Sequence, residues 1–289
     1  MYLFQKTQGY SYVYGIGLLC LVISCTCNND ADSNRNPSVP DKEKPSQPPR
    51  PFFWEKWIQK AKNNGYNTLA DTLAKLEKGE TVDINYEVLA EAVMLDHADI
   101  FNKLIASGAK LDIKDENNST LLHQAAQGGS IEIVKILIEK LPLESYSQED
   151  QKGFTPLHYA ILNNQVEIAK ILIDKLPVDI LSKKDKYENT LLHYAVKNYP
   201  VIEAIAIPMI NKLPADKLNE KDVSGFAPLH YCAMIHTNTE IASKLIAKGA
   251  DINILTKSGY TPLFLAKGRK KLEMEKLLLK AGANNDYKR

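Results

Sequence analysis

Apolar residues recur along the chain at helical spacing, in short runs separated by polar turns. Two such stripes in the middle of the chain are Ile133, Ile136 and Leu137, and Ile168, Ile171 and Leu172. Two earlier stripes are Trp54, Trp57, Ile58 and Ala61, and Leu69, Leu73 and Leu76. A spacing of three to four residues places the side chains of each stripe on one face of a helix. The pattern predicts an all-α protein built from many short helices.

A six-residue motif repeats between these stripes. The copies are TLLHQA from Thr120, TPLHYA from Thr155, TLLHYA from Thr190, APLHYC from Ala227 and TPLFLA from Thr261. Successive copies are 35, 35, 37 and 34 residues apart. A threonine oxygen can cap a helix, and proline fits the first helical position because no N–H is needed there. Each copy therefore predicts a short inner helix followed by a second helix, and such pairs must stack to bury their apolar faces.

Four of the copies contain a histidine, at His123, His158, His193 and His230. A histidine that recurs once per repeat is typical of a residue with a structural role, whereas a catalytic residue is needed only once in the protein. Packed helices lie about 8–10 Å apart, but zinc requires nitrogen ligands at about 2 Å, so histidines of adjacent repeats cannot share an ion. We therefore predict no metal site, and assign to a structural repeat motif Thr120, His123, Thr155, His158, Thr190, His193, His230 and Thr261.

The period and the motif resemble those of the ankyrin-repeat family. The residues that carry the resemblance are Asp150, Gly153, Thr155 to His158, Glu167 and Ile168 in one repeat, and Gly249 to Asn253 after another. The resemblance implies an all-α ankyrin-repeat solenoid of stacked helix-turn-helix units with hairpin-like finger loops, whose histidines hydrogen-bond the turns. Asp115, Asp150, Asp185 and Asp222 each precede a finger. We expect N-terminal capping helices at 52–81 and six units at 82–114, 115–149, 150–184, 185–221, 222–255 and 256–289.

Two features depart from the family pattern. Three units end in KLP, with prolines at Pro142, Pro177 and Pro214, where ankyrin repeats usually have a glycine-alanine turn. We expect an altered connection between units there. Pro208 falls inside the second helix of the fourth unit, where it is expected to kink or split that helix.

Ankyrin repeats usually bind proteins through a concave face made by finger tips and exposed inner-helix positions, which we call the inner face. Transferred unit by unit, the resemblance predicts partner-binding side chains at Phe154, Leu162, Tyr187, Phe226, Met234, Ile235 and Tyr260. Contiguous apolar patches with aromatic anchors are typical of interaction surfaces. The alternative is that these aromatic residues pack sideways against adjacent fingers. Tyr159, Tyr194 and Tyr231 follow the histidines and are interpreted as inter-unit packing.

Composition narrows the function classes. The 289 residues are 25% charged with a formal net charge of +1, which gives no indication of a nucleic-acid partner. Neither a P-loop, a dinucleotide fingerprint, a metalloprotease motif nor a nucleophile elbow occurs. We expect no catalytic residue, cofactor or small-molecule substrate, and an enzyme with an unrecognised site is the alternative. Cys232 is interpreted as a small buried thiol.

The N-terminus indicates export. The apolar run from Gly15 to Ser24 is too short to span a bilayer and predicts a signal peptide at 1–24. Val22 to Cys25 resembles a bacterial lipobox, which implies cleavage before Cys25, lipidation of its thiol and a membrane anchor. An ordinary secretory signal with a chance cysteine is the alternative. The absence of an aspartate after the cysteine favours the outer over the inner membrane, and the Pro-rich stretch 25–51 predicts a disordered tether.

These features together predict a non-enzymatic protein-binding scaffold, exported and lipid-anchored in the bacterial envelope. Its inner face is expected to meet a protein partner, for which a host protein is one candidate. The alternative is a periplasmic or envelope accessory protein that docks a neighbouring envelope component.

Overall fold

The structure, a computed structural model, describes residues 54–197, 202–235 and 239–284. All of them belong to one compact unit that begins at Phe52. The expected signal peptide, the lipidation site at Cys25, the tether and Pro200 lie outside the described residues. Each helix found in the described ranges is too short or too polar to cross a membrane.

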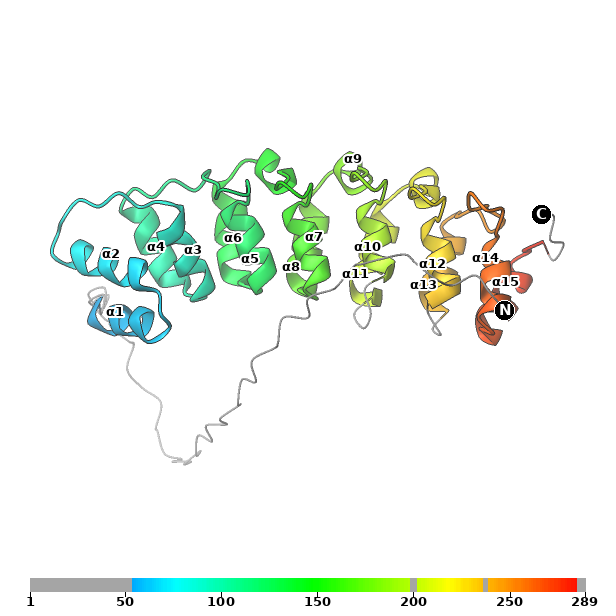
Figure 1. The fold of residues 1–289 in the computed structure, drawn as a ribbon, viewed down its shortest axis with the longest axis horizontal. Coiled ribbons are helices and arrows are strands. Elements are labelled where there is room, and N and C mark those ends of the chain that lie inside the picture. Colours follow the sequence, from blue (N-terminus) through cyan, green and yellow to red (C-terminus); the bar gives the residue numbers. More distant parts are fainter. Residues whose placement is uncertain (1–53, 198–201, 236–238, 285–289) are drawn as a thin grey trace, which may run out of the picture. The chain divides into compact units, whose positions relative to one another are not determined.

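Helices follow one another in antiparallel pairs, side by side in chain order (Figure 1). The first pair, within the expected cap, is α1 (Trp54–Asn63) and α2 (Asn67–Glu77). The next three pairs are α3 (Tyr86–Met94) with α4 (Ala98–Ala106), α5 (Leu121–Gly128) with α6 (Ile131–Lys140), and α7 (Pro156–Leu162) with α8 (Val166–Lys175). The last three are α10 (Leu191–Lys197) with α11 (Ile202–Lys212), α12 (Pro228–Ile235) with α13 (Glu240–Ala247), and α14 (Pro262–Gly268) with α15 (Leu272–Lys280). We call these six pairs and their loops units one to six.

The described residues contain no β-strand, and the expected all-α solenoid of stacked helix-turn-helix units is confirmed. One continuous hydrophobic core runs through all the pairs, from Ile58 in α1 to Leu278 in α15. In the stripe of α8, Ile168 and Leu172 are buried and Ile171 packs against the core from its edge. Each fully buried aliphatic side chain contributes about 1.5–3 kcal/mol, so the stacking of units is the main source of stability.

The KLP connections each add a short helical turn that the sequence analysis did not predict. These turns are η1 (Leu143–Ser147), α9 (Val178–Leu181) and η2 (Ala215–Asn219), and they lie along one edge of the array (Figure 1). Each proline is the N-cap of its turn. Four residues after the proline, an apolar side chain enters the core, namely Tyr146, Leu181 and Leu218. The altered connection therefore widens the core of units two to four.

Pro208 does not split the second helix of unit four. The helix α11 continues through Pro208 to Lys212. Proline removes only one backbone hydrogen bond from the helix interior, and the flanking Ile205, Ala206, Met209 and Ile210 are all buried. Packing on both sides of the proline thus holds the helix together.

The repeat histidines cap their own inner helices. In unit three, Thr155 is the N-cap residue of α7 and Pro156 its first residue. The Thr155 backbone N–H donates to Nδ1 of His158 over 3.0 Å, and the threonine hydroxyl lies 2.9 Å from the same nitrogen. Because an N–H group can only donate, Nδ1 must be unprotonated. The neutral ring therefore carries its hydrogen on Nε2.

That second nitrogen connects neighbouring units. His123 Nε2 donates to the Phe154 carbonyl of unit three over 2.9 Å, and His193 Nε2 to the Phe226 carbonyl of unit five over 3.0 Å. His230 Nε2 lies 3.0 and 3.1 Å from two carbonyls of the next turn, those of Ile254 and Tyr260. The expectation that the histidines hydrogen-bond the turns agrees with this geometry. Burial lowers the pKa of His158 and of His193 to about 4.

Replacement of His193 by phenylalanine, the residue found at Phe264 in unit six, should destabilise the array. The ring would be kept, but the Thr190 N–H would lose its partner, and the Phe226 carbonyl would keep only the Asp222 N–H as a donor. An unsatisfied buried N–H costs about 1–3 kcal/mol, so urea unfolding at pH 7 should show a loss of about 1–3 kcal/mol. His193→Gln is the control, because its amide can both accept and donate, and a smaller loss is expected.

The wild type and His193→Phe should differ in how their free energy of unfolding depends on pH. The folded pKa of about 4 for His193 lies below the value of about 6.5 for an unfolded histidine. The unfolded chain therefore binds the proton first, and the stability contributed by the neutral ring is lost as pH falls from about 6.5 through 4. His193→Phe should remove part of this loss. An identical pH dependence in both proteins would contradict the assignment.

Candidate functional site

The fingers of units two to five are each folded by the carboxylate that begins them, and in unit six the Thr256 hydroxyl accepts the Tyr260 N–H instead. In unit three, Asp150 Oδ1 accepts hydrogen bonds from the N–H groups of Lys152 and Phe154, at 2.8 and 2.9 Å. The Asp150 N–H donates to the Phe154 carbonyl over 2.9 Å and closes the loop. Asp115, Asp185 and Asp222 make the same two side-chain bonds in units two, four and five. A carboxylate is well suited to this turn because it only accepts hydrogen bonds.

The tyrosines after the histidines fix the fingers to the inner helices. Tyr159 donates its phenol to Asp150 Oδ2 over 2.6 Å. Tyr194 and Tyr231 donate to Asp185 and Asp222 in the same way, each over 2.5 Å. Their rings also pack edge-on against the histidine of the preceding unit, with centroids 5.7, 5.1 and 6.2 Å apart. The sequence analysis foresaw the packing but missed the phenol bond, whose signal is the nine-residue spacing from aspartate to tyrosine.

These hydrogen bonds lower the pKa of the finger carboxylates Asp150 and Asp222. Burial alone would raise the pKa of Asp150, but the hydrogen bonds from Tyr159 and from two backbone N–H groups lower the pKa below its usual range. Asp222 has a lowered pKa for the same reasons. Burial and the adjacent carboxylate raise the pKa of Tyr159 and of Tyr231. The aspartates are therefore charged and the tyrosines neutral at physiological pH, which is the state in which the bond is strongest.

Two of the seven predicted binding residues belong mainly to this framework. Phe154 stacks on His158 with a centroid distance of 5.1 Å and meets Tyr194 of the next unit edge-on at 5.8 Å. Phe226 lies 5.5 Å from His230 and 5.3 Å from Tyr231. Phe154 thus packs sideways onto the next unit, as in the alternative interpretation, whereas the ring contacts of Phe226 are with the inner helix of its own unit.

The other predicted residues are more open to solvent. Leu162, Tyr187, Ile235 and Tyr260 have exposed fractions of 36%, 39%, 40% and 40%, and Met234 is half-buried. Tyr260 is also stacked on Phe264, with centroids 4.6 Å apart. Leu162 and Ile235 stand at the ends of the inner helices α7 and α12. The inner face thus combines fixed aromatic rings with exposed aliphatic side chains, and the binding role stays a prediction.

Lys197 is a feature of this face that the sequence analysis missed. It ends the inner helix α10, at the position that Leu162 occupies in unit three. Its ammonium lies 4.0 Å from the ring centroid of Tyr231 and donates to Asn189 Oδ1 over 3.0 Å. Burial lowers the pKa of Lys197, and the finger carboxylates Asp222 and Asp185 act in the opposite direction. The signal in the sequence is a charge at an inner-helix position that is uncharged in units two, three and five.

Adjacent fingers are joined by backbone hydrogen bonds at three junctions. Gln151 N–H donates to the Asn117 carbonyl over 2.9 Å, Val223 N–H to the Tyr187 carbonyl over 3.2 Å, and Lys257 N–H to the Ser224 carbonyl over 3.2 Å. At the last of these, a side chain on Gly225 (φ +81°) would stand 2.4 Å from the Lys257 nitrogen. The described residues show no such bond between the fingers of units three and four, and no carbonyl partner for His158 Nε2.

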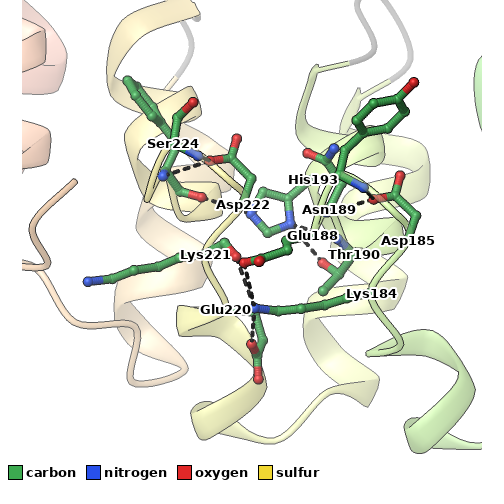
Figure 2. A network of polar contacts seen from close by, with 12 residues as sticks. Lys184, Asp185, Glu188, Asn189, Thr190, His193, Glu220, Lys221, Asp222 and Ser224 are labelled. Carbon is green, nitrogen blue, oxygen red and sulfur yellow. Dashed lines mark hydrogen bonds and ion pairs between the residues drawn. The ribbon is translucent and has the colours of Figure 1, made fainter. Parts of the chain in front are cut away.

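Ion pairs add a contact between the starts of the fourth and fifth fingers. Figure 2 shows Lys184 extended toward the start of the fifth finger. Its ammonium lies 3.0 Å from Glu220 Oε2 and donates to the Lys221 carbonyl over 2.9 Å. Glu188 of its own finger lies 4.0 Å away. Such partly exposed pairs contribute at most about 1 kcal/mol, so they orient the finger more than they stabilise it. In the described ranges, no three His, Cys, Asp or Glu side chains gather in a way that could hold a metal ion.

Substitution of a framework ring and of an exposed aliphatic residue of the inner face should have different effects on the free energy of unfolding. Phe154→Ala removes a ring that touches two units, and we expect a loss of about 2 kcal/mol, below the 3–5 kcal/mol of a fully buried phenylalanine. Leu162→Ala, at an exposed site seven residues after Thr155, should stay within about 0.5 kcal/mol of the wild type. Urea unfolding of the two variants side by side measures this. Equal losses would contradict the division into framework and open surface.

Comparisons with known proteins agree with this architecture. The family model of ankyrin repeats, three copies, matches residues 89–184, 148–216 and 192–289. A search of curated proteins gave no significant match. Among solved structures, one chain of the complex between the predatory endopeptidase Bd0816 from Bdellovibrio bacteriovorus and immunity protein Bd3460 is similar, with 28% identity and a TM-score of 0.58 over 68% of this chain and 99% of that chain.

An ankyrin repeat domain from Acinetobacter baumannii AYE, ABAYE2397, has a TM-score of 0.59 at 24% identity, over 68% of this chain and 98% of that domain. This second likeness shows the fold alone. The family matches extend without a gap from residue 89 to residue 289, which is well over half of the sequence. The chain belongs to the ankyrin-repeat family.

Proposed function

We propose that this chain is a non-enzymatic binding protein whose inner face holds a protein partner. The observation that carries the proposal is the set of exposed apolar side chains on a framework that is already fixed. Leu162 and Ile235 are exposed on helices whose other faces are buried in the core. A rigid surface loses little conformational entropy on binding, so such anchors contribute more of their burial energy to affinity.

The proposal includes export and a lipid anchor. Its support is the order of features in the sequence, in which a short apolar run ends in Val22-Ile23-Ser24-Cys25 and a Pro-rich tether leads to the folded unit at Phe52. Several acyl chains on one cysteine suffice for stable anchoring. Thr26 in place of an aspartate supports an outer-membrane position. The array would then stand off the membrane at the end of its tether.

Two partner classes follow from an exported array. One is a foreign protein, such as a host protein, met at the cell surface. The other is a neighbouring component of the envelope. The similarity to a chain from the endopeptidase–immunity protein complex makes a bacterial peptidase the first partner to test.

A photo-crosslinking amino acid placed at Leu162 or at Ile235 should capture the partner in living cells. We expect one discrete adduct at both sites, identified by mass spectrometry. The matched control is the same amino acid at Lys170, on the outer helix α8, where the side chain is exposed and paired with Glu167. Adducts of equal yield at Lys170, or none at either inner-face site, would refute binding through this face.

Fractionation of cells with Cys25→Ala tests the anchor separately. Wild-type protein should sediment with membranes, whereas the variant, without an acyl acceptor, should be released. Protease added to intact cells then distinguishes the partner classes, because a clipped array faces the exterior and a protected one faces the periplasm. Membrane association that is unchanged in Cys25→Ala would show that the lipobox interpretation is wrong.

A further inference from the structure

Positive and negative side chains occupy different parts of the inner face. In units three to six the finger tips carry the exposed lysines Lys152, Lys186 and Lys257, and Arg269 follows the inner helix of unit six. Glu188 is the exposed carboxylate among the same finger tips, and it lies 4.0 Å from Lys184. The finger aspartates are held by backbone and phenol hydrogen bonds. This part of the inner face is therefore positive, although the whole chain has a formal net charge of only +1.

The first two units differ from this pattern. At the position that Lys186 and Lys257 occupy in their fingers, unit two has Glu116, and unit one has Asp83. Both side chains are exposed. A partner that ran along the whole face would meet opposite charges at its two ends. The positive region thus has a boundary, between units two and three.

Lys197 lies within the positive region. Its ammonium forms one hydrogen bond with the described residues, to the neutral Asn189 amide, and lies over the Tyr231 ring. The two nearest finger carboxylates each accept a phenol and two backbone N–H groups. A lysine ammonium has three donors. Two of the three donors form no hydrogen bond with the described residues. A half-buried cation has already lost part of its hydration, so a carboxylate that reaches it gains more than at a fully solvated lysine.

Exposed or half-buried apolar side chains lie on either side of this cation. Leu162 ends the inner helix of unit three, and Met234 and Ile235 end that of unit five. Tyr187 extends from the finger between them and carries the Lys186 ammonium 5.1 Å from its ring centroid. A cation flanked by aliphatic and aromatic surface fits a segment in which acidic and large apolar side chains alternate.

We propose that the inner face of units three to six docks an acidic segment of a partner protein, with carboxylates paired to Lys186, Lys197 and Lys257 and apolar side chains seated on Leu162 and Ile235. The inference rests on the proposed function, because it specifies the partner of the same face. Electrostatic attraction of this kind speeds association and selects against basic partners.

The test is selection from a random peptide display library on the purified full-length protein. Enriched peptides should carry a net negative charge together with large apolar residues, and the affinity of the strongest should fall as salt rises. Lys197→Met, which replaces the ammonium by an uncharged, unbranched side chain, should weaken that peptide about tenfold. Lys170→Met on the outer helix is the matched control and should change the affinity less than about twofold.

Two further measurements keep the inference falsifiable. Lys186→Glu alters only an exposed finger tip, so it tests the charge requirement even if Lys197→Met proves unstable in thermal melts. A labelled single-stranded oligonucleotide serves as a polyanion without aliphatic side chains, and binding as tight as that of the peptide would overturn the inference. Enriched peptides without acidic bias, or none at all, would also overturn it. If the acidic-segment inference failed but the crosslinker at Leu162 still captured a partner, the proposed binding function would remain supported.

Discussion

A neutral histidine ring bridges successive units of this array, and the rest of the structure depends on that bridge. Nδ1 accepts the backbone N–H that begins its own inner helix, so Nε2 must carry the hydrogen that is donated to the next finger. One ring therefore satisfies a buried N–H at a helix start and gives a loop carbonyl, which already accepts the N–H of the finger aspartate, a second hydrogen bond. Because the two bonds require opposite roles of the two nitrogens, the ring works only in one tautomer and only without a charge.

The histidine hydrogen bonds also help to fix the geometry of the fingers. The carbonyl that receives the histidine bond belongs to the residue at the end of a finger, and the same residue is held by the aspartate that begins it. The tyrosine then links that aspartate back to the inner helix. Between units three and four, where the described residues form neither the histidine nor the finger hydrogen bond, the rings of Phe154, His158 and Tyr194 maintain the contact. On the outer side, Lys212 donates to the Ile173 and Asp174 carbonyls at the end of α8, over 2.6 Å each.

Features with a period could be predicted from the sequence, because each repeat provides an independent copy of the same signal. The helix pairs, the finger aspartates and the structural histidines were all of this kind. The turns after Pro142, Pro177 and Pro214 were missed because their buried residues do not repeat one residue type. These residues are Tyr146, Leu181 and Leu218. Pro208 was expected to interrupt a helix on local propensity, and buried neighbours on both sides of it outweigh that propensity. Lys197 has no counterpart in the other repeats, so no comparison between copies could reveal it.

Residues that depart from the repeat are also the ones with freedom to serve a partner. A histidine or finger aspartate that changed would lose bonds in two places at once, whereas the side chains at the ends of the inner helices form none of the hydrogen bonds described between units. Gln127, Leu162, Lys197 and Met234 occupy one such position in four successive units, and they include a neutral polar side chain, two apolar ones and a cation. The shared framework determines where these side chains stand, to within the spacing of one unit. Specificity can then reside in their identities, since changing one of them leaves the hydrogen bonds between the units intact.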